Sequence, residues 1–175
     1  MIIGGGWGMD LSTLALSLTR EQFRARFDCF FLCADLGVGK STRPQRTEVF
    51  NGEEKTEAYA GPMPGSPFAA PLVKVQETFP SMIMLGRTLN NDIVVGDTSI
   101  SKFHAFFRVA PGGLVEVADA GSRNGTFVGT EKLTPKQMKR LRAGDRVRFA
   151  RLAFQLLDAP TCWDWLVKAL DNWGD

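Results

Sequence analysis

The feature that most constrains the fold is a series of short apolar segments that occupies the chain from Leu72 onward. The segments are rich in β-branched and aromatic residues, and turn-forming residues separate them. Many short segments of this kind at close spacing predict the strands of an all-β sandwich with two antiparallel sheets. In chain order they are LVKVQET, MIMLG, DIVV, HAFFRVA, LVEVAD, TFV, RVRFA and AFQLL.

Both ends of the chain are predicted to form helices outside the sandwich. Near the N-terminus, Thr19 and Gln22 have the spacing of a capping box, and an apolar face with helical spacing extends toward Gly37. That face consists of Phe23, Phe27, Phe30, Phe31 and Ala34. After Pro160, Thr161 is expected to cap a second helix with an apolar stripe. The stripe consists of Trp163, Leu166, Leu170 and Trp173.

These elements divide the chain into four parts. Residues 1–39 are expected to be an N-terminal helical extension, and residues 40–70, rich in Pro, Gly and charge, a flexible linker. Residues 71–158 form the predicted sandwich, and residues 159–175 the C-terminal helix. We expect the two helical stripes to be buried within the chain; a homodimer or a docking face for a partner is the alternative.

Composition limits the classes of protein to consider. A length of 175 residues with 44% hydrophobic content suits one core domain with extensions. No apolar run reaches the roughly 20 residues of a membrane span, and Met1–Gly8 lacks the features of a signal peptide. Three cysteines and one histidine cannot supply a standard zinc site, and they favour a reducing, cytoplasmic location.

The charge of the chain is unevenly distributed. The net charge of +2 does not by itself indicate a nucleic-acid partner, and we expect neither nucleic acid nor a membrane as a partner. Residues 82–158 nevertheless hold 12 Lys and Arg against 7 Asp and Glu. An anionic ligand would favour this local excess of positive charge.

Cationic and small polar residues occur between the predicted strands, where a sandwich places its binding loops. Side chains that donate hydrogen bonds from such loops suit an oxyanion such as phosphate, and the guanidinium fork of arginine matches phosphate geometry. The candidate ligand-binding residues are Arg87, Ser101, Lys102, Arg123 and Asn124.

Three short patterns around these residues resemble the forkhead-associated (FHA) domain family, as found in bacterial FHA proteins. They are GR at 86–87, SxxHA at 101–105 and SxNGT at 122–126, in this order. The resemblance covers about residues 72–158, half of the chain. Members of that family read phosphothreonine on partner proteins, so the resemblance implies a binding module without catalytic residues, metal or cofactor.

The resemblance also implies a role for each residue that matches a family position. Arg87 and Ser101 match the phosphate contacts, and Lys102 stands where the family usually carries another phosphate contact, Arg or Asn. Arg123 lies in the loop that flanks the phosphothreonine. Asn124 matches the residue that hydrogen-bonds the backbone of the ligand peptide.

Further positions match structural features of the family. Gly86 and Gly125 match turn positions, and His104 matches a histidine that holds the binding loops together. Gly129-Thr130 departs from the family, which often has Asn after this strand. Ser99 stands where some members place an arginine that selects the residue three positions after the phosphothreonine, so that preference stays open.

The function that follows is an adaptor in Ser/Thr kinase signalling. Its expected partners are phosphothreonine-containing proteins, either kinase substrates or the kinases themselves. Thr47 or Thr56 of the linker, once phosphorylated, is a candidate ligand for the protein's own site, because a flexible tether gives a high effective concentration. The alternative is a structural or oligomerisation module that acts independently of phosphate.

One competing motif is a relaxed P-loop pattern at residues 34–41, ADLGVGKS. A P-loop follows a strand and opens a helix at its Lys-Ser pair. The preceding residues have helical spacing, and Pro44 disfavours the required helix. We therefore do not expect nucleotide binding.

Overall fold

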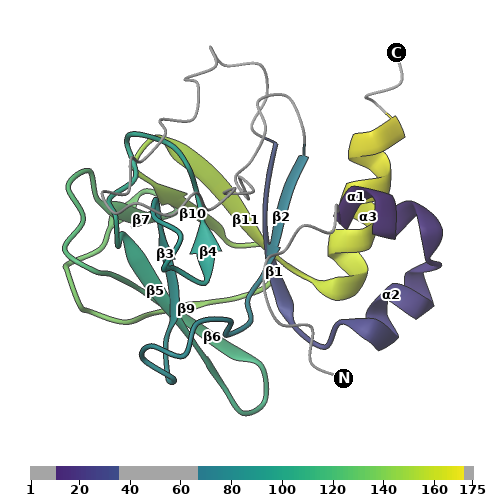
Figure 1. Cartoon of the computed structure of the whole chain (residues 1–175), viewed down its shortest axis with the longest axis horizontal. Helices are drawn as coiled ribbons and strands as arrows, with labels where there is room; N and C mark the ends of the chain where they lie inside the picture. The colour runs from purple at the N-terminus through teal and green to yellow at the C-terminus, as the bar shows by residue number, and fades with distance from the viewer. Residues whose placement is uncertain (1–10, 36–66, 172–175) are drawn as a thin grey trace, which may run out of the picture.

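The computed structural model describes residues 11–35 and 67–171. Two β-sheets face each other, and three helices lie together at one end of the molecule (Figure 1). The all-β sandwich with terminal helices that the sequence predicts is confirmed. No helix within the described ranges is long and apolar enough to cross a bilayer.

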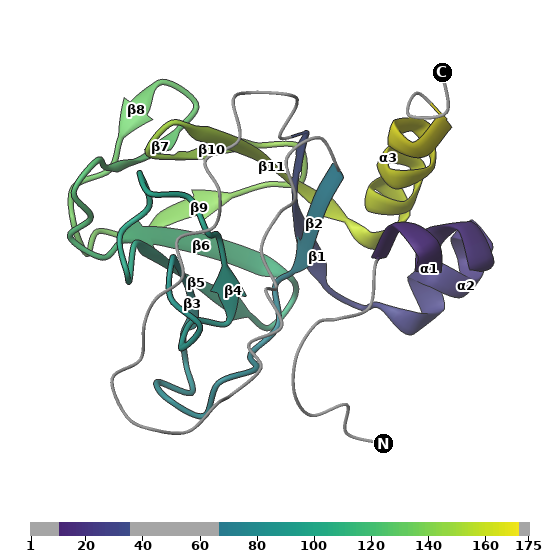
Figure 2. The ribbon, with the colours of Figure 1, turned by 45° about the horizontal axis from the view of Figure 1, so that its top comes forward.

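The larger sheet has six strands, each antiparallel to its neighbours. Their spatial order is β2 (Pro67–Pro71), β1 (Phe30–Asp35), β11 (Leu152–Asp158), β10 (Arg146–Phe149), β7 (Thr126–Val128) and β8 (Glu131–Lys132). Figure 2 shows the helices beside the β1–β2 edge, with β7 and β8 at the opposite edge.

The smaller sheet has five strands, and only the β3–β4 pair is parallel. Their order is β4 (Ile93–Val94), β3 (Ile83–Gly86), β5 (Ala105–Ala110), β6 (Leu114–Asp119) and β9 (Lys139–Leu141). Alternate residues of both sheets point into a shared core, as the two-residue period of a strand requires. Leu85, Phe107, Phe149 and Leu156 are among its fully buried members.

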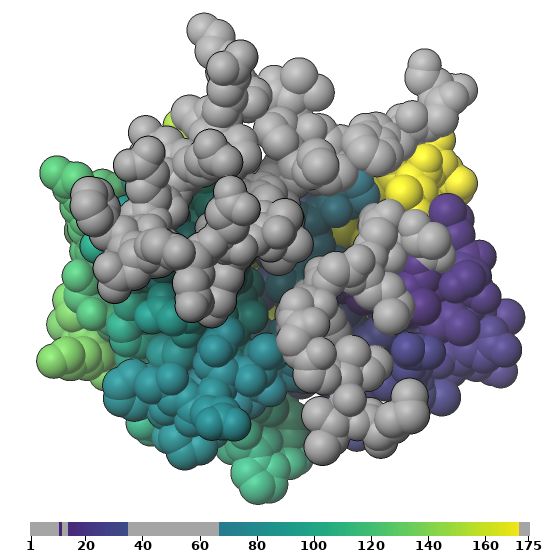
Figure 3. Space-filling model, viewed as in Figure 1, coloured from purple at the N-terminus to yellow at the C-terminus, as the bar shows by residue number. Residues whose placement is uncertain are grey.

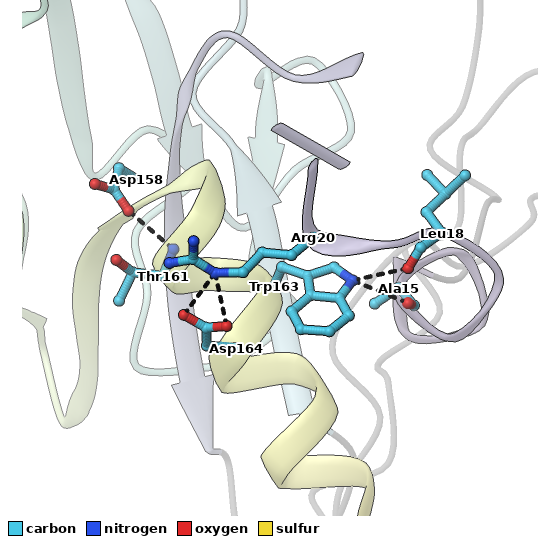
Figure 4. Close-up of polar contacts among 7 residues, drawn as sticks. All are labelled: Ala15, Leu18, Arg20, Asp158, Thr161, Trp163 and Asp164. Carbon is cyan, nitrogen blue, oxygen red and sulfur yellow. Dashed lines mark hydrogen bonds and ion pairs between the residues drawn. The ribbon is translucent and has the colours of Figure 1, made fainter. Parts of the chain in front are cut away.

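The terminal helices are α1 (Leu11–Ser17), α2 (Arg20–Arg26) and α3 (Ala159–Asp171), and they enclose a second core. Thr19 and Gln22 form the predicted capping box. The Trp163 indole N–H donates to the carbonyls of Ala15 and Leu18, both at 3.1 Å (Figure 4).

An ion pair adds to this packing, with Arg20 Nε 2.9 Å from a carboxylate oxygen of Asp164 (Figure 4). The helices lie together in the space-filling view (Figure 3). The expected burial of the terminal stripes within the chain is confirmed for Phe23, Phe31 and Leu166, and Phe27 and Trp163 pack against them. Trp173 lies outside the described residues.

The predicted N-terminal helix extends too far. Helix α2 ends at Arg26, and Phe30–Asp35 form strand β1, which lies between β2 and β11 in the larger sheet. Leu32 packs in the core between the sheets, whereas Phe31 and Cys33 pack against the helices. Because both faces of β1 are buried, its sequence is apolar at nearly every position, and such a run does not distinguish a strand from a helix.

This correction moves the predicted boundaries of the sandwich. Residues 30–35, assigned above to the helical extension, pair with β11 and with β2. Residues 67–70, assigned to the linker, lie in β2. The remainder of the predicted linker, with Thr47 and Thr56, lies outside the described residues.

The start of α3 also differs from expectation. The helix begins at Ala159, and the backbone N–H of Thr161 donates to Asp158 Oδ1 at 2.9 Å. Asp158 is therefore the cap, and the prediction that Thr161 caps the helix is wrong. Pro160 fits the first turn, where a missing N–H costs no helical hydrogen bond.

The expectation that a helix precedes the glycines of the P-loop pattern is likewise wrong, because strand β1 precedes them. Its surroundings still differ from those of a P-loop. A P-loop joins a strand to a crossover helix, as in parallel sheets, whereas β1 is antiparallel to both neighbours. Residues 36–41 of the pattern lie outside the described ranges.

Candidate anion-binding site

Hydrogen bonds join the three loops that carry the candidate residues. The backbone N–H of Arg87, just after β3, donates to the carbonyl of Ser101 in the β4–β5 loop at 3.0 Å. The N–H of Arg123 in the β6–β7 loop donates to Ser101 Oγ at 3.0 Å. The structure thus brings together residues that are up to 36 positions apart in the printed sequence.

Arg87 is half-buried and its side chain is anchored at one point. Its Nε donates to the carbonyl of Ile100 at 3.1 Å. Within the described residues, its two terminal nitrogens donate to nothing. The end of the guanidinium fork is therefore oriented by the protein and available for an anion, which lowers the entropy lost on binding.

Ser101 connects the backbone of two loops and keeps one donor. Its Oγ accepts from Arg123, so its own hydroxyl proton points elsewhere and can be donated to a ligand. Its backbone N–H donates to His104 Nδ1 at 3.1 Å.

Asn124 and Lys102 border the same site. Asn124 Nδ2 donates to the carbonyl of Ser99 at 2.7 Å, which leaves its exposed amide oxygen free to accept from a ligand backbone. Lys102 is exposed, and its carbonyl accepts from Asn91 Nδ2 at 2.7 Å. That bond fixes the backbone of Lys102 and leaves its side chain exposed to solvent.

The site is positively charged. Five ion pairs occur among the described residues, and none includes Arg87, Lys102 or Arg123. Three cations without a neutralising carboxylate produce a local field that attracts anions.

His104 is completely buried and connects the loops from beneath. Its Nδ1 accepts from Ser101, so the proton of the neutral ring lies on Nε2, which donates to the carbonyl of Gly125 at 3.1 Å. Burial lowers the pKa of His104, although the contact with Gly125 and the nearby Asp119 charge oppose that shift. The ring therefore stays neutral near pH 7 and acts as a structural connector.

Two glycines of the site have steric reasons for being glycine. A Cβ on Gly86 would lie 2.1 Å from the carbonyl oxygen of Lys102, so any side chain there would push the β4–β5 loop away. Gly125 has a φ of +84°, a left-handed backbone conformation that a residue with a side chain adopts only with strain.

Asp119, which was not among the residues expected from the sequence, shapes the β6–β7 loop. Its buried carboxylate accepts from the N–H groups of Gly121 and Ser122, from Ser122 Oγ and from Thr126 Oγ1, at 2.6–2.9 Å. Burial raises the pKa of Asp119, but these four bonds outweigh burial and hold the pKa below its usual value. An Asp at the end of a strand, followed two positions later by Gly-Ser, is a turn signal, and it would have indicated the role of Asp119.

A second buried carboxylate, Asp92, was also missed. It accepts from Lys74 Nζ and from the backbone N–H groups of Val75, Gln76 and Met84, at 2.7–2.8 Å. It thereby fastens the segment after β2 to strand β3. Burial raises the pKa of Asp92, but these donors outweigh it and lower the pKa overall.

The arrangement provides hydrogen-bond donors in loops that lie side by side. Within residues 11–35 and 67–171, no three His, Cys, Asp or Glu side chains are grouped to hold a metal ion. A hollow of about 910 Å³ lies elsewhere, between α2, the β5–β6 turn and the start of α3, and none of the candidate residues lines it. The candidate site is an open loop surface, which suits an extended ligand.

Comparison with known proteins agrees with the resemblance noted in the sequence. Residues 83–150 match the family model described as FHA domain. The oxoglutarate dehydrogenase inhibitor of Corynebacterium efficiens is 36% identical over 75 residues, which cover 43% of this chain and 50% of the relative. The glycogen accumulation regulator GarA of Mycolicibacterium smegmatis is 37% identical over 75 residues, covering 43% and 45%.

Among solved structures, the FHA domain of the CT664 protein from Chlamydia trachomatis is similar with a TM-score of 0.47 and 23% identity. That match covers 74% of this chain and 97% of the other. The chain spans about half the length of the curated relatives it matches.

Proposed function

We propose that this chain, whose residues 83–150 match the FHA domain family, is a phosphothreonine-dependent protein–protein interaction module. The observation that carries the proposal is the convergence of Arg87, Ser101 and Lys102 at one end of the sandwich. Each has a donor without a partner in the described chain, and hydrogen bonds fix the backbone around each of them.

A phosphate dianion would accept from these donors. The Arg87 guanidinium and the Lys102 ammonium supply charge, and the Ser101 hydroxyl supplies a neutral donor. Charge-assisted hydrogen bonds contribute roughly 1.5–3 kcal/mol each. Two or three such bonds, with backbone contacts, support a Kd on the order of micromolar.

The proposed role of Asn124 is to hold the peptide that carries the phosphate. Its amide is oriented by the carbonyl of Ser99, and its free oxygen can accept from a peptide N–H. Arg123 lies beside it, exposed, where it would contact residues that flank the phosphothreonine. The proposed preference for phosphothreonine over phosphoserine is supported only by the resemblance to the FHA family.

The adaptor would act without catalysis, downstream of a Ser/Thr protein kinase in the cytoplasm, on kinase substrates or on the kinases themselves. Two relatives are named as an enzyme inhibitor and as a regulator of glycogen accumulation. By that likeness, docking on a metabolic enzyme is part of the proposal. A phosphorylated Thr47 or Thr56 remains a candidate internal ligand, which would lower the affinity for external peptides.

The test is fluorescence polarisation of the full chain with a degenerate phosphothreonine peptide library, beside phosphoserine and unphosphorylated pools. We expect binding to the phosphothreonine pool only. Arg87→Ala should weaken it about 10- to 150-fold, the equivalent of one lost charge-assisted hydrogen bond. Arg108→Ala is the matched control, because Arg108 is an exposed arginine in β5 outside the loops.

Equal binding of phosphorylated and unphosphorylated pools would overturn the proposal in favour of the phosphate-independent module. So would an Arg87→Ala variant that binds as well as the unmodified chain.

A further inference from the structure

The β4–β5 loop contains a tight turn at residues 97–100 that is organised by one carboxylate. Asp97 Oδ1 accepts from the backbone N–H of Ser99 at 2.8 Å and from its hydroxyl at 2.5 Å. The N–H of Ile100 donates to the carbonyl of Asp97 at 3.0 Å. Asp97 thus determines the direction of the carbonyl groups that follow it.

Two carbonyls of this turn orient side chains of the proposed site. The carbonyl of Ser99 accepts from Asn124 Nδ2 at 2.7 Å, and the carbonyl of Ile100 accepts from Arg87 Nε at 3.1 Å. Any rotation of the turn would therefore move the anchors of both the proposed phosphate contact and the proposed peptide contact.

The second oxygen of Asp97 binds a residue from the other sheet. Arg151 lies in the turn between β10 and β11, and its Nη2 is 2.6 Å from Asp97 Oδ2. The side chain of Asp97 is only 14% exposed, whereas that of Arg151 is 58% exposed. The pair ties the loop of the smaller sheet to a turn of the larger one.

We propose that Arg151 is a positioning residue of the phosphopeptide site. Through Asp97 it fixes the 97–100 turn, and through that turn it fixes the directions of Asn124 and Arg87. This inference rests on the proposed function, and it assigns a role to an arginine that lies outside all three FHA patterns.

The position of Asp97 makes this pair more than an ordinary surface ion pair. Exposed pairs contribute little because solvent screens them and both side chains lose freedom. Asp97 is mostly shielded and already holds two hydrogen bonds from Ser99, so the arginine completes a connected network. Burial raises the pKa of Asp97, but the bonds from Arg151 and Ser99 outweigh it and keep the carboxylate charged.

The test compares three variants of the full chain by phosphopeptide affinity. Arg151→Ala should weaken binding roughly three- to fivefold, the effect of one partly shielded ion pair. Arg151→Lys should restore most of the affinity, because an ammonium group can still reach the carboxylate. Arg140→Ala is the control. Arg140 lies in β9, outside the loops, and its Nε is 3.8 Å from a carboxylate oxygen of Glu116 in β6. Removing the Arg140 side chain should leave the affinity for the phosphopeptide unchanged.

A double-mutant cycle with Asp97→Asn separates positioning from direct contact of Arg151 with the peptide. The asparagine oxygen can still accept from Ser99, but the charge that holds Arg151 is gone. If Arg151 acts through Asp97, Arg151→Ala should cause no further loss in the Asp97→Asn background. An equal loss in both backgrounds would show direct contact and overturn the inference.

An NMR readout makes the result independent of binding. In Arg151→Ala, the side-chain amide signals of Asn124 and the backbone amide signal of Ser99 should shift, and in Arg140→Ala they should not. If the unmodified chain binds no phosphopeptide, the proposed function fails, and these signals still decide the positioning role. Unmoved signals, or full peptide affinity in Arg151→Ala, would overturn it.

Discussion

Removing the imidazole of His104 should destabilise the fold by an amount that can be divided between its two hydrogen bonds. In His104→Ala, the N–H of Ser101 loses its acceptor, and the carbonyl of Gly125 keeps only the N–H of Ala150 as a donor. An unsatisfied buried polar group costs about 1–3 kcal/mol. The ring also packs against Phe149, with 5.8 Å between centroids, so its removal leaves a cavity.

We expect a total loss of about 3–4 kcal/mol in the free energy of unfolding. A domain of ordinary stability, about 5–15 kcal/mol, would still fold. The midpoint of thermal unfolding should fall by roughly 6–16 °C for a chain of this size.

Two further variants separate the bonds. The side-chain oxygen of asparagine lies close to the position of imidazole Nδ1, and the amide nitrogen of glutamine lies close to that of Nε2. His104→Asn should therefore keep the acceptor for Ser101, and His104→Gln the donor to Gly125. Each should be about 1 kcal/mol more stable than His104→Ala.

Urea unfolding at pH 7.5, followed by fluorescence of the tryptophans, measures all three variants. The control is Arg108→Ala, which should change the free energy of unfolding by less than about 0.5 kcal/mol. A loss below about 1 kcal/mol in all three His104 variants would refute the account of His104 as the connector of the loops.

Three other predictions concern stability. Asp92→Asn turns one carboxylate oxygen into an NH₂ group that faces at least one of three backbone N–H donors, so it should lower the free energy of unfolding in urea by about 2–4 kcal/mol. Lys74→Met should lower it by only about 1 kcal/mol. Equal losses in the two variants would contradict this. Gly86→Ala should cost more than about 2 kcal/mol and weaken peptide binding, because its Cβ meets the Lys102 carbonyl. Gly112→Ala, where φ is +83° but nothing lies within 4 Å, should cost only about 1 kcal/mol and leave binding intact. The third prediction is that stability falls as the pH drops below about 6.5, the ordinary pKa of His104. Burial lowers that pKa in the folded state, so the unfolded chain binds the proton more readily. The slope should reach at most about 1.4 kcal/mol per pH unit and disappear in His104→Gln; a flat profile between pH 7.5 and 5 would contradict it.

The sandwich could be predicted from the sequence because most of its strands are short, locally bounded and separated by turn residues. The position of the polar candidates in loops could also be predicted, because the strands on either side of them are recognisable. Strand β1 could not be recognised, since helices cover one of its faces and the sandwich covers the other. An apolar run of this kind has no period that distinguishes a strand from a helix.

The residues that hold the loops were harder to predict. Asp92 binds backbone groups up to 17 positions away, and Arg151 meets Asp97 across 54 positions. Nothing local in the sequence marks such partners, because only the closure of two sheets brings them together. The cap of α3 was missed for a simpler reason: both Asp158 and Thr161 are good capping residues, and the strand and the helix meet without a loop between them.

The most direct test of the central claim is an NMR titration of the ¹⁵N-labelled full chain with a phosphothreonine peptide selected from the library. We expect the perturbed signals to cluster at Arg87, Ser101, Lys102, Arg123 and Asn124. We expect the signals of α1, α2 and α3 to stay unchanged and the unphosphorylated peptide to have no effect. Perturbations confined to the helices or to the hollow beside α2, or identical with both peptides, would contradict the claim that these loops read phosphate.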